Sequence, residues 1–143
     1  MAHSTIDVEH LFTITADLGD NTHALIRNGP AGTRVIASVT GGSFEGPRLK
    51  GTVVPPGGDW VSVRPNRIIK LDVRLLLVTD DDESILMTYQ GIGTPADDGP
   101  TQLRTAPTFE TGADAYSWLN DVQAVGIGTS DGISVTYDIY ALS

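Results

Sequence analysis

Glycines recurring inside one extended segment constrain the fold of this chain more than any other feature. The segment runs from Gly42 to Gly51 with the sequence GSFEGPRLKG, and a turn-like PPGGDW follows at Pro55–Trp60. Small residues at this spacing let two backbones approach closely or let a strand bend sharply. An all-β protein needs such positions where its sheet curls, so the segment predicts a strongly curved sheet.

Length and composition predict one domain over residues 1–143, with residues 1–8 as a flexible N-terminus. The chain has 143 residues, of which 40% are apolar, enough for a single core. It contains no cysteine, so thiol chemistry and disulfides are excluded. It lacks both an apolar run of roughly 20 residues and the layout of a signal peptide, so a cytoplasmic location is expected.

The formal net charge of −9 argues against a nucleic-acid partner, because such binding requires Lys and Arg to neutralise phosphates. No membrane partner is expected either. Many of the acidic residues fall in two predicted loops, Asp80–Glu83 and Asp97–Asp98. We interpret these as a solvated rim, since they lack the alternating ligands and central glycine of a calcium loop.

β-branched residues and turn dipeptides dominate the chain, and helical periodicity is nearly absent. The final strand alternates most clearly, with Ile133, Val135, Tyr137 and Ile139 on its apolar face. The expected strands are 11–16, 24–27, 33–39, the glycine-rich segment, 60–63, 68–78, 84–90, 122–127 and 133–140.

About eight to ten short strands indicate a sandwich or a closed antiparallel barrel. Turns are predicted at 17–21 and 128–132, and one short helical turn near residues 113–120. Residues 93–107 are rich in Pro, Gly, Asp and Thr, so we expect a long loop there.

No sequence motif points to a cofactor, a metal or a nucleophile. Gly128–Gly132 matches the G-x-S-x-G pattern of hydrolases, but it joins two predicted strands and every histidine lies upstream. The three histidines are scattered without ligand spacing, and no phosphate-binding or dinucleotide fingerprint is present. We therefore expect neither cofactor nor metal.

Five separated segments, read together, resemble the DUF3237 family, also called UPF0311. They are GGSFEGPRLKG at 41–51, GGDW at 57–60, LDVR at 71–74, RTAPTFETG at 104–112 and YSWLN at 116–120. The resemblance covers roughly residue 10 to the C-terminus. It implies a lipocalin-like antiparallel barrel with a small-molecule pocket, in a family that is mostly uncharacterised.

The chain departs from the family pattern at two places. Residues 65–67 read PNR where the family usually has Pro-Asp-Gly, and residues 93–102 are short and acidic where the family commonly has a longer, partly helical insertion. A shortened flap at a barrel mouth would change access to the pocket, which suggests an unusual substrate.

Asp72, Arg74 and Tyr89 are the predicted catalytic residues. Asp72 and Arg74 are two positions apart, so on a strand they share a face with Cα atoms about 7 Å apart. If Leu71, Val73 and Leu75 face inward, the pair instead lies in water as a weak exterior ion pair. Since the resemblance puts the pair in a recurring motif, we expect it inside the barrel, with Tyr89 on a neighbouring strand as a hydrogen-bond donor.

Further residues are predicted to bind substrate. Four aromatic residues would supply flat apolar walls, with core packing as the alternative for Trp118. Three charged residues are secondary candidates, with an exterior ladder pair as the alternative for Glu45. The full set is Trp60, Phe109, Tyr116, Trp118, Glu45, Lys50 and Arg104.

These features predict a cofactor-independent enzyme that moves protons on a small, partly apolar carbonyl compound. The reaction would be that of an isomerase, a cyclase or a hydratase/dehydratase-type lyase, with Asp72 carrying the proton. The alternative is a non-catalytic barrel that carries or sequesters an apolar metabolite. A small-molecule ligand is the expected partner, and a homodimer is one expected assembly.

Overall fold

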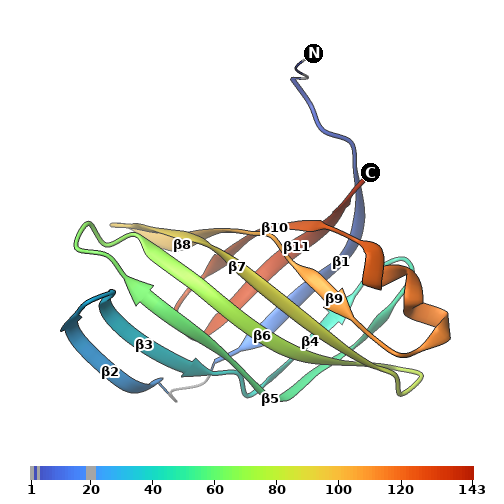
Figure 1. The fold of residues 1–143 in the computed structure, drawn as a ribbon, viewed down its shortest axis with the longest axis horizontal. Coiled ribbons are helices and arrows are strands. Elements are labelled where there is room, and N and C mark those ends of the chain that lie inside the picture. Colours follow the sequence, from blue (N-terminus) through green and yellow to red (C-terminus); the bar gives the residue numbers. More distant parts are fainter. Residues whose placement is uncertain (1, 3, 19–21) are drawn as a thin grey trace.

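The computed structural model describes residues 2, 4–18 and 22–143, with backbone alone for residues 22–25. The chain forms an antiparallel β-barrel with one short helix (Figure 1). The turn predicted at 17–21 falls partly on residues 19–21, which lie outside the described residues. No helix in the described part of the chain has the length and apolar character needed to cross a membrane.

Eleven strands and one 3-10 helix follow each other along the described residues. They are β1 (Val8–Asp17), β2 (Thr22–Gly29), β3 (Gly32–Ser38), β4 (Gly41–Glu45), β5 (Lys50–Val63), β6 (Ile69–Thr79), β7 (Ser84–Ala96), β8 (Gly99–Thr105), β9 (Thr108–Glu110), η1 (Asp114–Asp121), β10 (Ala124–Ser130) and β11 (Ser134–Leu142).

Eight of these strands close into the barrel. The hydrogen-bonded order is β5-β4-β1-β11-β10-β8-β7-β6, and β6 pairs back onto β5. The first part of β5 pairs with β4 and the second part with β3, so β3 and β2 extend the sheet beyond the barrel wall. The predicted antiparallel barrel of eight to ten strands is confirmed, and η1 matches the predicted helical turn.

Alternation along β6 decides which side chains enter the barrel. Leu71, Val73, Leu75 and Leu77 are buried, and the residues between them face outward or are only partly covered. This period of two places one apolar row per strand in the interior. Near η1 the interior is filled by aromatic rings, such as Phe12, whose ring centroid lies 5.5 Å from that of Phe44 and 6.0 Å from that of Phe109.

Two glycines of the segment at 42–51 sit where backbones touch. A Cβ atom on Gly46 would overlap the carbonyl oxygen of Leu11, and one on Gly51 would overlap that of Val78. Neither position can hold a larger residue without moving a neighbouring strand. The close backbone approach predicted for this segment is therefore confirmed.

The long loop predicted for residues 93–107 is wrong. Residues up to Ala96 continue β7, a turn at Asp97–Asp98 follows, and Gly99–Thr105 forms β8. Leu103 and Thr105 are buried between exposed neighbours, which is the alternation of a half-buried strand. Polar threonines and two prolines hide that alternation in the sequence. The short segment 93–102 is thus the end of a β-hairpin.

Candidate functional site

A cavity of about 710 Å³ lies inside one end of the barrel. This is the end of the β7–β8 and β10–β11 turns, whereas η1 and the β6–β7 turn lie at the other end (Figure 1). Most of its wall is aliphatic. The apolar lining includes Leu18, Val39, Val61, Ile69, Leu71, Val73, Leu75, Leu103 and Val135.

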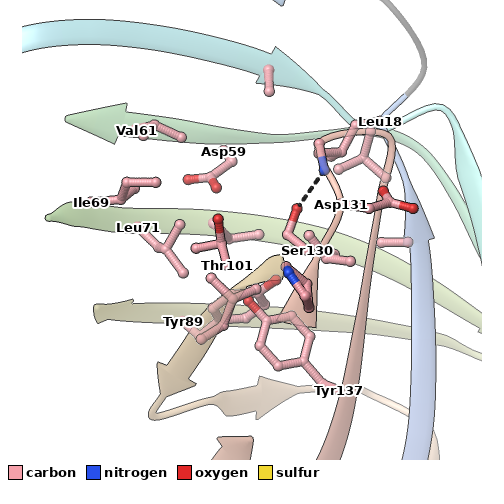
Figure 2. A pocket seen from close by; sticks show the side chains of 18 of the residues that line it. Leu18, Asp59, Val61, Ile69, Leu71, Tyr89, Thr101, Ser130, Asp131 and Tyr137 are labelled. Atoms are coloured by element: carbon pink, nitrogen blue, oxygen red, sulfur yellow. Dashed lines mark hydrogen bonds between the residues drawn. The ribbon is translucent and has the colours of Figure 1, made fainter. Parts of the chain in front are cut away.

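Asp59 brings a carboxyl group into this apolar space (Figure 2). It lies on β5 opposite Val73 of β6, which is an inward position of the barrel. The next residue along β5, Trp60, consequently points outward and is 38% exposed. Asp59 therefore sits in the lumen because it shares the alternation of its aliphatic neighbours.

Burial controls the protonation of Asp59. Loss of water around the carboxyl raises its pKa from 3.8 to about 6, and the nearby Asp72 carboxylate adds to this. One hydrogen bond opposes the shift, since the backbone N–H of Asp72 donates to Oδ1 of Asp59 at 3.1 Å. The Oδ2 atom accepts no hydrogen bond from the described residues. Asp59 can therefore both take up and release a proton close to neutral pH.

Tyr89 and Tyr137 place two phenol groups in the same cavity. Val73 pairs with Asp59 on one side and with Tyr89 on the other, so Asp59, Val73 and Tyr89 form one inward row across β5, β6 and β7. The rings of Tyr89 and Tyr137 meet edge to face, with centroids 5.4 Å apart. Burial is the main cause that raises the pKa of both hydroxyls, and a hydrogen bond between them raises the pKa of Tyr89 and opposes the shift of Tyr137. Both phenols are protonated at neutral pH and carry an O–H donor.

Gly128 on β10 makes room for the Tyr137 ring. It pairs directly with Tyr137, and a Cβ atom at Gly128 would lie 2.5 Å from Cδ1 of that ring. The ring can therefore lie across β10 toward Tyr89. A Cβ atom there would also overlap the carbonyl oxygen of Thr136, so a side chain at Gly128 would shift β11 as well as the Tyr137 ring.

Other polar groups at the rim are engaged in the local turn. Asp131 accepts hydrogen bonds from the backbone N–H groups of Ile133 and Ser134, both at 2.8 Å, and these lower its pKa. The Ser130 hydroxyl accepts the N–H of Gly132 at 3.1 Å, as drawn in Figure 2. These contacts hold the β10–β11 turn. Thr101 adds a hydroxyl group to the wall, and Asp59 and the two tyrosines are the titratable groups that face the lumen.

The structure places only Tyr89 of the three predicted catalytic residues in the cavity. The expectation that Asp72 and Arg74 face the interior is wrong, because Leu71, Val73 and Leu75 occupy the inward positions of β6. Arg74 lies outside, with its guanidinium carbon 5.8 Å from the centroid of the Trp60 ring. Asp72 reaches the site through its backbone N–H.

Two more predicted binding residues lie on the outer face. Trp60 was expected as a pocket wall, but it faces away from the lumen, since Asp59 and Val61 take the inward positions. Arg104 is exposed on β8 and donates to the carbonyl of Leu103 at 2.8 Å. Neither lines the cavity.

The remaining predicted binding residues belong to the opposite end of the barrel or to its core. Tyr116 donates to the Asp81 carboxylate at 2.7 Å, and the Arg48 guanidinium carbon lies 3.6 Å from the centroid of the Trp118 ring. The first contact holds η1 beside the β6–β7 turn, and the second holds it beside the β4–β5 turn. Phe109 is a core residue, Glu45 is exposed on β4, and Lys50 is exposed with Nζ 3.9 Å from Oδ2 of Asp80.

Sequence reasoning missed Asp59 and Tyr137 as site residues. The signal for Tyr137 was present, because it falls on the apolar face of the last predicted strand. Asp59 lies in the GGDW segment, but the role of substrate binding was assigned to the neighbouring Trp60. Reading Trp60 as exposed would have put Asp59 inside.

Comparison with known proteins assigns the chain to a family. The sequence model of the family described as "Protein of unknown function (DUF3237)" matches residues 6–142. The chain belongs to the DUF3237 family. A UPF0311 protein of Rhodopseudomonas palustris is 33% identical, over 95% of this chain and 96% of that protein. The resemblance seen in the sequence is thereby confirmed.

Solved structures of proteins similar to this chain share the barrel. A β-barrel like protein from Acinetobacter baumannii superposes with a TM-score of 0.90 at 32% identity, covering 99% of both chains. An enzyme from Penicillium herquei superposes with a TM-score of 0.76 at 25% identity, covering 100% of this chain and 99% of that one. A protein of the same fungus named as a hydroalkoxylation enzyme is 30% identical, over 80% of this chain and 70% of that protein. One distant relative of this chain is thus an enzyme.

Proposed function

We propose that this chain is a cofactor-independent enzyme that uses Asp59, Tyr89 and Tyr137 for proton transfer on a partly apolar carbonyl compound. The reaction we propose is ring closure, in which a substrate hydroxyl adds across a C=C bond conjugated with a carbonyl. The observation that carries the proposal is a buried carboxyl group that titrates near neutrality, opposite two phenol donors in an apolar cavity.

The proposed mechanism begins with the Asp59 carboxylate removing the proton of the substrate hydroxyl through its Oδ2 atom. The oxygen attacks the far carbon of the C=C bond, and the π electrons move to the carbonyl oxygen. Tyr89 and Tyr137 donate hydrogen bonds to the enolate that forms. The proton held by Asp59 is then returned to the carbon next to the carbonyl. One O–C bond and one C–H bond form, one O–H bond and the C=C π bond break, and no oxidant or reductant is needed.

The name of the fungal relative supports this reaction class. Hydroalkoxylation is the addition of an O–H group across a C=C bond, and that relative is 30% identical to this chain over 116 residues. Its printed name says nothing about which residues act. The assignment of Asp59, Tyr89 and Tyr137 rests on the cavity described above.

Hydroxy-enones that can close a ring test the proposal directly. The purified protein would be incubated with a panel that includes (E)-7-hydroxy-1-phenylhept-2-en-1-one, whose terminal hydroxyl adds to its own enone and creates a stereocentre. We expect faster closure than in buffer and an excess of one enantiomer, measured by chiral chromatography. Racemic product formed at the rate in buffer across the panel would contradict the proposal.

Tyr137→Phe is expected to lower kcat by about 10- to 1000-fold, because it removes one donor to the developing enolate. The ring and its packing against Tyr89 are retained, so the melting temperature should change little. The fall should appear mainly in kcat, with KM changed less, since the donor acts on charge that develops during the reaction. An unchanged kcat would remove Tyr137 from the mechanism.

A non-catalytic binding barrel is the second candidate. The volume of the cavity and its largely aliphatic wall are what a carrier of an apolar metabolite requires. A carrier would bind the panel compounds without converting them, and Asp59→Asn would change affinity alone.

A further inference from the structure

We infer that the ligand of the cavity is an uncharged molecule with a hydroxyl group at one end and a carbonyl group at the other. This inference deepens the proposed function and rests on it for the identity of the site. It concerns which charge and polarity the cavity accepts, which can be measured by binding without any turnover.

An anionic ligand would find no counter-charge in the cavity. None of the described residues that line it is Lys, Arg or His, and the charged lining residues are Asp59 and Asp131. Arg74 follows the lining residue Val73 along β6, but its side chain lies on the outer face beside Trp60. A carboxylate or phosphate entering this space would lose its water and meet a carboxyl group of like charge. The cavity therefore rejects anions.

A cationic amine could pair with Asp59, but the surroundings do not complete its hydrogen bonds. An ammonium group carries three donors, and Val61, Leu71 and Val73 around Asp59 offer no side-chain acceptor. One oxygen of Asp59 is already used by the backbone N–H of Asp72. A neutral hydroxyl needs a single acceptor, and Oδ2 of Asp59 supplies it.

The two ends of the inward row differ in hydrogen-bonding character. Asp59 accepts, while Tyr89 and Tyr137 each bring a phenol O–H group that can donate. Asp59 and Tyr89 are separated by two strand spacings, which puts their Cα atoms about 10 Å apart. A hydroxyl therefore faces Asp59 and a carbonyl faces the tyrosines, with apolar atoms between them.

Three naphthalene compounds of nearly equal shape test the charge selection. They are 1-naphthylmethanol, 1-naphthoate and 1-naphthylmethylammonium, with Kd measured for each by isothermal titration calorimetry at pH 5.5, where most of Asp59 is protonated. We expect the alcohol to bind at least tenfold more tightly than either ion. An ion that binds as tightly as the alcohol, or more tightly, would overturn the inference.

Two lysine variants provide a matched comparison on adjacent positions of β5. Val61→Lys puts a cation into the cavity wall, and we expect it to tighten naphthoate binding at least tenfold. Trp60→Lys puts the same cation on the outer face and should leave naphthoate binding unchanged. Equal effects of both variants would show that surface charge, rather than the cavity, controls binding.

These outcomes are separable from the proposed reaction. Charge selection without ring closure in the hydroxy-enone panel would contradict the enzyme proposal and support the inference. Ring closure by a protein that binds naphthoate as tightly as the alcohol would support the enzyme proposal and contradict the inference. Because Val61→Lys could disturb folding, Asp59→Asn serves as a second variant. At pH 8, where Asp59 is ionised, this variant should narrow the difference in Kd between the alcohol and naphthoate.

Discussion

Asp59→Asn is expected to lower kcat by about 10²–10⁴-fold, because it removes the group that takes up and returns the proton. Asparagine has nearly the same shape and can still accept the N–H of Asp72 through its Oδ1 atom. The cavity and its ability to bind ligand should therefore persist. The measurement is the rate of ring closure under single-turnover conditions, compared with the unchanged protein.

The same substitution is expected to stabilise the fold at neutral and higher pH. The pKa of Asp59 is about 6 in the folded chain against 3.8 for an ordinary aspartate, so the folded state holds the proton more tightly than the unfolded state. Stability attributable to this group is therefore greatest at low pH and falls as pH rises from about 4 to 6. Above that window the ionised carboxyl costs at most about 3 kcal/mol. Urea unfolding at pH 4 and pH 8 should show the gain in Asp59→Asn at pH 8 only.

Asp72→Asn is the matched control for the turnover measurement. Asp72 lies on the outer side of β6, and its hydrogen bond to Asp59 is made by the backbone N–H, which the substitution leaves in place. We expect turnover within a few-fold of the unchanged protein. A control that loses as much activity as Asp59→Asn would move the catalytic role back to Asp72.

Gly46→Ala is expected to destabilise the barrel by about 3 kcal/mol or more, because a Cβ atom there would overlap the carbonyl oxygen of Leu11. That oxygen belongs to the backbone, so relief requires β1 and the β4–β5 turn to separate. The midpoint of urea unfolding, followed by circular dichroism, measures the loss.

Gly112→Ala provides the control for this steric argument. No atom lies within 4 Å of a Cβ built on Gly112, so the same chemical change should alter stability by no more than about 0.5 kcal/mol. Equal midpoints for Gly46→Ala and Gly112→Ala would mean that close strand approach does not hold the barrel together.

The barrel could be predicted because its determinants are local. Alternating apolar residues, as in the last strand with Val135 and Tyr137, mark half-buried strands, and the glycines at 46 and 51 mark close backbone approach. β8 escaped prediction because its inward positions include Thr105, a polar residue, and prolines flank the turn before it. Burial of such strands depends on partners far away in the sequence.

The site was harder to predict because it depends on which face of each strand is inward. Along 68–78 one face is apolar throughout, whereas the other carries Lys70, Asp72 and Arg74, so alternation alone favours Leu71 inside. The resemblance led to the opposite prediction, with Asp72 inside. The barrel decides it through pairing, since Val73 lies between Asp59 and Tyr89.

The resemblance segments also misled in a specific way. The residues around 41–51 and 116–120 are prominent in the sequence, yet they serve the end of the barrel opposite the cavity. Arg48 and Trp118, for example, stack there and join η1 to the β4–β5 turn. A recurring motif in a barrel can thus make contacts that close one end of the fold, and it need not form a binding site.

Carbon-detected NMR titration of the Asp59 carboxyl group tests most directly whether the lumen contains a carboxyl group that titrates near neutral pH. The protein would be labelled with ¹³C at aspartate side chains, and Asp59→Asn would identify the resonance. A midpoint near pH 6 that moves when a neutral cavity ligand is added is the predicted result. A midpoint near 3.8 that the ligand leaves unchanged would mean that Asp59 is in contact with bulk water, and it would contradict the proposed site.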